Sequence, residues 1–130
     1  MKHIIIYFIL SIAFAACSGY KKTNTVKPEE KPVRIANDEL KYELIVFDNG
    51  FNRFLNSIAQ PRGFISLNQL ETRNKILASN YNARVNNVNQ FGDIYGPRIE
   101  YQSHIHYGYE VNYLLYNYFL FFQNKYNQKL

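Results

Sequence analysis

Outside the N-terminus, apolar residues are densest between Tyr109 and Tyr126. They recur at spacings of three and four residues, which indicates one wide apolar face on a helix. The segment is much longer than a common strand of about 5–6 residues, so we expect a helix that forms the structural centre of the domain. Asn112 and Asn117 interrupt the apolar run and argue against a membrane span. The apolar face comprises Val111, Leu114, Leu115, Tyr118, Phe119, Phe122 and Tyr126.

Two tyrosines lie at the sides of this face, Tyr113 and Tyr116. Tyrosine combines an apolar ring with a polar hydroxyl that seeks a partner or water. We therefore expect these two side chains to form an exposed edge that serves as a partner surface. The alternative is that both belong to the core.

Two earlier segments also show helical spacing. The first spans Phe51 to Ile58 and ends before Pro61. The second begins at Ser66, which forms a capping-box pattern with Gln69, and should end in the Asn-rich stretch 86–89. Its expected apolar stripe comprises Leu67, Leu70, Leu77, Tyr81, Val85 and Val88.

Short strands are expected at two places. Glu43 to Asp48 is rich in β-branched and aromatic residues and precedes an Asn-Gly turn. Arg98 to Gln102 lies among glycine and proline signals and is a second short strand that could pair with the first. The expected fold class is α+β, mainly helical, with about three helices and a small two-stranded sheet.

The first sixteen residues have the features of a secretory signal peptide. A basic start at Lys2 and His3 precedes an apolar run from Ile4 to Ala16, which is too short for a membrane span of about 20 residues. The tetrapeptide from Phe14 to Cys17 resembles a lipobox, with Phe where Leu is common. This resemblance implies that Cys17, the single cysteine, carries acyl chains such as palmitate and serves as a membrane anchor.

Residues 17–32 predict a lipidated cysteine followed by a flexible tether, because the stretch is polar, charged and proline-containing. Residues 33–130 are then a single globular domain. In this domain ten basic residues stand against eight acidic ones. The basic residues are spread singly rather than clustered, so nucleic acid is not an expected partner.

Candidate chemistry is sparse. His104 and His106 have the spacing of a weak metal site, with Glu100 or Asp93 as conceivable third ligands. No nucleophile elbow or phosphate-binding glycine loop is present, and we expect no cofactor. Glu110 lies near the start of the last helix, where a carboxylate stabilises the positive end of the helix dipole.

Four features are distinctive when taken together: the last-helix motif from Tyr107 to Phe119, the segments Glu43–Asp48 and Asn80–Arg84, and the signal. Together they resemble a family of small uncharacterised lipoproteins of Bacteroidota. Tyr81 departs from the pattern, which often has Trp there. The resemblance implies an envelope location and no established activity. In that group an acidic run after the cysteine marks export to the cell surface, whereas here Ser18 follows and the first acid is Glu29.

We therefore expect a lipoprotein of the bacterial cell envelope, lipid-anchored on the outer membrane and facing the periplasm. Its domain is expected to act as a non-catalytic binding or structural module, and not as an enzyme. The expected partners are the membrane and an envelope protein or cell-wall glycan. The alternative is a small hydrolase or metal-dependent enzyme that uses His104 and His106.

Overall fold

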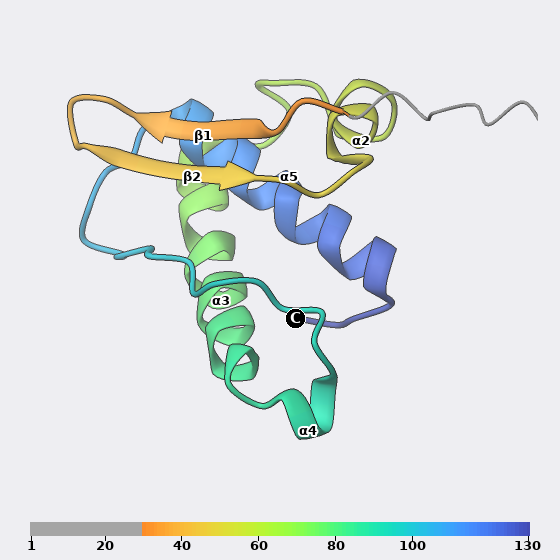
Figure 1. The fold of residues 1–130 in the computed structure, drawn as a ribbon. Coiled ribbons are helices and arrows are strands. Elements are labelled where there is room, and N and C mark those ends of the chain that lie inside the picture. The colour runs from red at the N-terminus through yellow and green to blue at the C-terminus, as the bar shows by residue number, and fades with distance from the viewer. Residues whose placement is uncertain (1–29) are drawn as a thin grey trace, which may run out of the picture.

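The computed structural model describes residues 30–130, so the expected signal peptide, Cys17 and most of the tether lie outside the described residues. Within that range the expected α+β class is confirmed, with a two-stranded antiparallel sheet and mainly helical structure (Figure 1). The elements in chain order are β1 (Val33–Asn37), β2 (Tyr42–Val46), α2 (Phe51–Ser57), α3 (Leu67–Val85), α4 (Val88–Phe91) and α5 (Tyr109–Tyr126).

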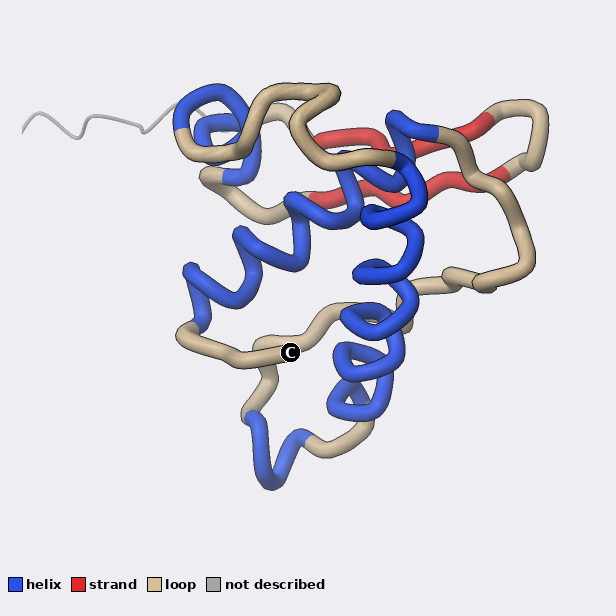
Figure 2. The backbone as a smooth tube through the Cα atoms, turned by 180° about the vertical axis from the view of Figure 1, so that it is seen from behind, coloured by secondary structure: helices blue, strands red, loops and turns tan. Residues whose placement is uncertain are grey.

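Helix α5 is the structural centre, as its apolar pattern predicted, and it has the expected bounds. It packs against α3, β1 and α2, and its residues from Val111 to Phe119 are all buried. Leu115 and Phe119 have no exposed surface. Seen from behind, α3 and α5 meet near the hairpin and diverge toward their other ends (Figure 2). Among the helices of residues 30–130, none has the length and apolarity that a bilayer span requires.

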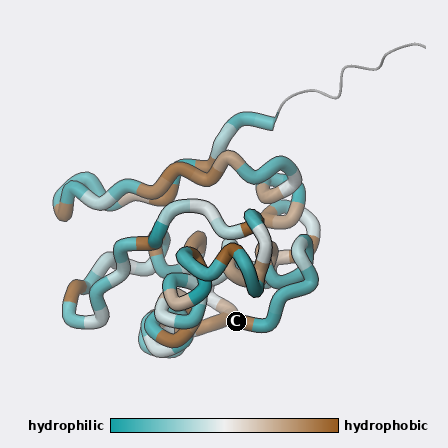
Figure 3. Tube along the Cα trace, turned by 60° about the horizontal axis from the view of Figure 1, so that its bottom comes forward, coloured by the Kyte–Doolittle hydropathy of each residue, from teal (hydrophilic) through white to brown (hydrophobic). Residues whose placement is uncertain are grey.

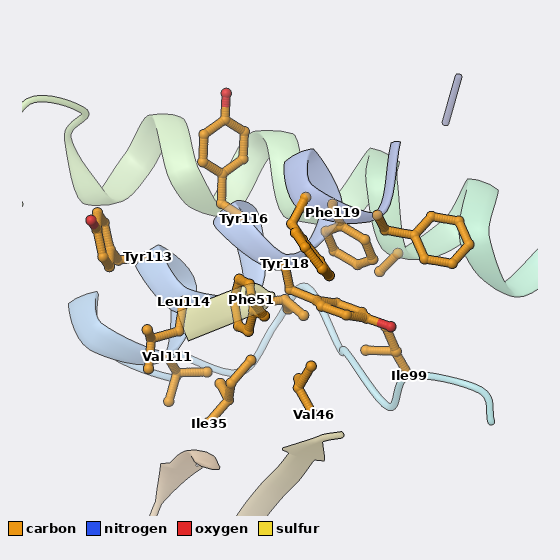
Figure 4. Close-up of a cluster of buried hydrophobic side chains, with 14 of the residues drawn as sticks. Ile35, Val46, Phe51, Ile99, Val111, Tyr113, Leu114, Tyr116, Tyr118 and Phe119 are labelled. Atoms are coloured by element: carbon orange, nitrogen blue, oxygen red, sulfur yellow. The ribbon is translucent and has the colours of Figure 1, made fainter. Parts of the chain in front are cut away.

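The expected exposed edge at Tyr113 and Tyr116 is not found. Their side chains are only 5% and 8% exposed, because α5 is covered on its flanks as well as on its apolar face. The Tyr113 hydroxyl donates to the backbone oxygen of Gln60 at 2.8 Å. The Tyr116 hydroxyl accepts from Arg73 at 2.7 Å. Protein groups therefore take the place of the partner expected at these hydroxyls, and both rings belong to the core (Figure 4).

The expected pairing of the two strands is wrong. The β2 strand pairs antiparallel with β1, in a register that places Ile35 opposite Leu44. Arg98 to Gln102 is not a strand. The physical reason is that side chains of other elements form hydrogen bonds with its backbone groups, in particular with the N–H and C=O of Ile99. Hydrophobic residues run along the middle of the β1–β2 hairpin (Figure 3). Two of the hairpin residues, Ile35 and Val46, are buried in the core.

Helix α3 opens as expected, and its buried face matches the expected stripe only in part. Ser66 and Gln69 form both bonds of the capping box. The buried residues of the helix are Leu70, Asn74, Ala78 and Tyr81, whereas Val88, expected on the stripe, belongs to α4 and is 52% exposed. Buried Asn74 donates through Nδ2 to the backbone oxygen and to Oδ1 of Asn112 on α5, at 2.9 and 3.1 Å. Polar contacts therefore join the two long helices in the core.

Candidate functional site

An apolar groove of about 490 Å³ separates β2 from the segment 94–99. We call it the β2 groove. Three tyrosines from the two long helices contribute to its lining, and one of them, Tyr118, extends from α5 toward Ile99, with Val46 on the hairpin side (Figure 4). The lining residues are Leu44, Ile45, Val46, Phe47, Asp48, Tyr81, Ile94, Gly96, Pro97, Ile99, Tyr118 and Tyr126.

The wall opposite β2 is held by side chains of α3. Asn82 donates through Nδ2 to the backbone oxygen of Ile99 and accepts from its N–H through Oδ1, both at 2.8 Å. The backbone N–H of Gly96 donates to the Tyr81 hydroxyl at 2.9 Å. Pro97 has no N–H to donate. These bonds fix the wall away from the strand, and the groove lies where the expected strand pairing would have been.

The strand side of the groove has a free edge. Within residues 30–130, β2 pairs with β1 alone, so alternate backbone N–H and C=O groups on its other side have no strand partner. Two large apolar side chains next to this edge are exposed, Ile45 at 44% and Phe47 at 75%. The groove therefore combines backbone hydrogen-bonding groups with an apolar surface.

At one end of the groove lies a carboxylate, Asp48, whose hydrogen bonds are made within the domain. Asp48 accepts from Lys125 Nζ and from the Tyr126 hydroxyl, both at 2.8 Å. The Tyr118 hydroxyl lies 3.4 Å from the other carboxylate oxygen. Burial is the main cause that raises the pKa of Tyr118 well above its ordinary value of 10.0, followed by electrostatic interaction with Tyr81 and then with Asp48. Tyr118 therefore stays neutral, and Asp48 serves as a structural acceptor.

The histidines singled out in the sequence do not line the β2 groove. His104 is exposed, and the His106 side chain is 87% exposed with Nδ1 3.4 Å from Glu71 Oε1. Neither Glu100 nor Asp93 joins them, since residues 30–130 contain no group of three His, Cys, Asp or Glu side chains placed to hold a metal ion.

Glu110 lies in the first turn of α5, as expected from the sequence. Both its carboxylate oxygens accept from Arg62, at 2.6 and 2.8 Å. The bond to Arg62 lowers the pKa of Glu110. The pair ties the loop before α3 to the start of α5, which is a structural role.

Sequence reasoning missed the β2 groove, because its walls come together only in the folded chain. It did not single out Asn82, the residue that fixes one wall. A usable signal was present at Gly96 and Pro97, because proline has no N–H for strand pairing and glycine weakens a strand. Cys17, the predicted lipidation site, lies outside the described residues.

The described residues thus define a small α+β domain with an open apolar groove beside a free strand edge. A family model described as "Family of unknown function (DUF6146)" matches residues 3–130. The chain belongs to this family. No curated protein and no solved structure matches the chain.

Proposed function

We propose that this chain is a lipoprotein of the bacterial cell envelope, of the Bacteroidota type, anchored through acyl chains on Cys17. The support is in the sequence: a basic start, an apolar run too short to span a membrane, and small residues Ala15 and Ala16 before the single cysteine. The chain from Ser18 to Glu29 is mostly polar and charged and serves as a tether, which is shorter than the expected 17–32 because Glu30 and Lys31 are bonded to α2. The domain faces the periplasm from the outer membrane.

The domain acts as a non-catalytic binding module that takes an extended apolar segment of an envelope protein into the β2 groove. The observation that carries this proposal is the free edge of β2 alongside an apolar hollow. An added strand would bond to the backbone of β2, and its alternate side chains would enter the hollow. Exposed Phe47 and Ile45 would then be covered. The apolar lining favours a protein segment over a glycan.

The polar groups around the groove support binding rather than catalysis. Asp48 is held by Lys125 and Tyr126, and the histidines lie elsewhere. A general base needs a free acceptor within reach of the proton that it removes. The side chain at the polar end of the groove is already bonded within the domain.

The anchor is tested by the mass of the mature N-terminal peptide. We expect a chain that begins at Cys17 and carries at least two acyl chains, and we expect Cys17→Ser to leave the membrane fraction. An unmodified Cys17, or a mature chain that starts elsewhere, contradicts the anchor. Protection of the domain from protease added to intact cells tests its periplasmic side.

The groove is tested by site-specific photo-crosslinking in native cells at Phe47, with Phe64 as the matched control. Both side chains are exposed, at 75% and 69%, and Phe47 lines the groove whereas Phe64 does not. We expect Phe47 to capture one apolar protein segment. The corresponding synthetic peptide should bind the purified chain and protect β2 amides from exchange.

Two results would count against the groove proposal. Equal capture by Phe47 and Phe64 would show non-specific contact with apolar surface. Capture of a glycan at Phe47 would replace the protein segment by a different ligand class. Phe47→Asp should weaken binding of the captured peptide about tenfold or more, because the charge would have to be desolvated in the complex, whereas Phe64→Asp should leave it unchanged.

A further inference from the structure

A second hollow, of about 480 Å³, lies between α3 and the segment 98–103. We call it the polar basin. No residue lines both hollows, although α3 and the segment 94–103 contribute to each. The basin has a different character, since its lining contains two cations, three hydroxyl groups and one side-chain amide. The lining residues are Lys75, Ala78, Ser79, Asn82, Ala83, Arg98, Tyr101 and Ser103.

Two cationic side chains line the basin, Lys75 and Arg98, and no carboxylate lines it. None of the ion pairs found within residues 30–130 involves either of them. Arg98 uses one nitrogen to donate to the backbone oxygen of Asn82 at 3.2 Å. The rest of its guanidinium fork and the Lys75 ammonium group have no side-chain partner in the described part of the chain.

The acids nearest in sequence, Glu71 and Glu100, do not line the basin. Glu71, one turn before Lys75, lies 3.4 Å from His106 Nδ1. Its charge also contributes to raising the pKa of Tyr101, although burial is the main cause of that shift. Glu71 is therefore close to the basin without lining it. The basin carries two positive charges without lining acids.

The rest of the basin is a fixed frame with free hydroxyls. Asn82 is held by its two bonds to Ile99. The Tyr101 hydroxyl donates to Asn112 Oδ1 at 2.8 Å, which fixes the ring. Ser79 and Ser103 have no side-chain hydrogen bond to any described residue, so both hydroxyls can serve a ligand.

We propose that the polar basin binds a small hydroxyl-bearing ligand through one acid group, a carboxylate or a phosphate, paired with Lys75 and Arg98. Arginine matches either acid group with two parallel N–H donors, and lysine supplies a compact second charge. The serine hydroxyls and the Tyr101 ring contact the rest of the ligand. An acidic sugar has this chemistry. The site is independent of the β2 groove and of the membrane anchor.

The test is titration of the purified full chain with glucuronate, glucose 6-phosphate and neutral glucose, followed by backbone NMR shifts. We expect at least one of the anions to bind at least tenfold more tightly than glucose and to shift the amides of Ser79 and Ser103. Lys75→Gln and Arg98→Gln should each weaken binding about tenfold, the loss of one charge-assisted hydrogen bond.

The matched control is Lys129→Gln, which removes one exposed charge that does not line the basin and should leave binding unchanged. Thermal melts of the variants check that they remain folded. Preference for glucuronate or for the phosphate identifies the acid group. The proposal is overturned if neither anion binds more tightly than glucose, or if Lys129→Gln weakens binding as much as Lys75→Gln does.

Discussion

The side chain of Asn82 pairs with the backbone of Ile99 as a neighbouring strand would. Its Nδ2 donates to the Ile99 oxygen and its Oδ1 accepts from the Ile99 N–H, both at 2.8 Å. One amide side chain on a helix thus satisfies both backbone groups of a buried residue, which is 3% exposed. The segment is fixed without a sheet, and a hollow is left on each side of it.

Asn82→Ala should therefore lower the free energy of unfolding by about 1–3 kcal/mol, because it leaves two backbone groups of Ile99 without partners. Urea denaturation measures the loss, and hydrogen exchange of the Ile99 amide should become faster. Asn68→Ala, at an exposed position of α3, is the control and should change stability by less than about 0.5 kcal/mol. Unchanged Ile99 exchange in Asn82→Ala would contradict the pairing.

Leu115→Ala should cost about 2–5 kcal/mol, because Leu115 is fully buried at the centre of α5. Thermal melts or urea denaturation would measure it. Ile76→Ala on α3 is the control, since Ile76 is 57% exposed and loses little burial. Equal stabilities of these two variants would contradict the central place of α5 in the core.

Tyr42→Phe should stabilise the domain by about 1 kcal/mol or more. The Tyr42 hydroxyl is buried and has no hydrogen-bond partner within residues 30–130. Its removal therefore eliminates the free-energy cost of burying an unpaired polar group. Its ring, which packs 4.6 Å from that of Tyr107, is retained. The matched control is Tyr101→Phe, which removes a hydroxyl bonded to Asn112 and should destabilise. Chemical denaturation of both variants should give opposite signs.

Glu110 should contribute a small, pH-dependent part of stability through Arg62. The bond to Arg62 lowers the folded-state pKa of Glu110 below its ordinary value of 4.5. The contribution is therefore fully present above that value and is lost as the pH falls through the lowered pKa. Both side chains are more than half exposed, so Glu110→Gln should cost only about 0.2–1 kcal/mol at neutral pH.

The check is urea denaturation of the wild type and Glu110→Gln across the acid range. The two unfolding free energies should differ at neutral pH and converge below the folded-state pKa. A difference that persists in strong acid would show that the carboxylate charge is not its source. Added salt should shrink the difference at neutral pH, because the pair is exposed.

The helices were largely predictable from the sequence, because their signals are local. The spacing in Tyr109–Tyr126 set the bounds of α5, and the Ser66–Gln69 pattern marked the start of α3. The buried face of α3 was predicted only in part, since it includes Asn74 and Ala78. An apolar stripe cannot identify an asparagine that is buried because Asn112 on another helix satisfies its amide nitrogen.

The strand pairing and the two hollows depend on contacts between distant segments. The β1 sequence, Val33–Asn37, alternates too weakly to stand out, so β2 was assigned the wrong partner. The flanks of α5 are covered by the loop before α3 and by Arg73, which the sequence pattern does not reveal for Tyr113 and Tyr116. Lys75 and Arg98 are far apart in the sequence and line one basin only after folding.

The N-terminal end of the described chain is fastened to α2 rather than to the hairpin that it enters. Glu30 accepts from the Gly50 N–H at 2.8 Å and pairs with Arg53, and the Lys31 oxygen accepts from Asn52 at 2.8 Å. A mechanical load applied through the residues before Glu30 therefore reaches these contacts before it reaches β1. Under tension these contacts would break first. The β1–β2 register and the groove beside it would then stay intact at forces that are sufficient only to break the contacts with α2.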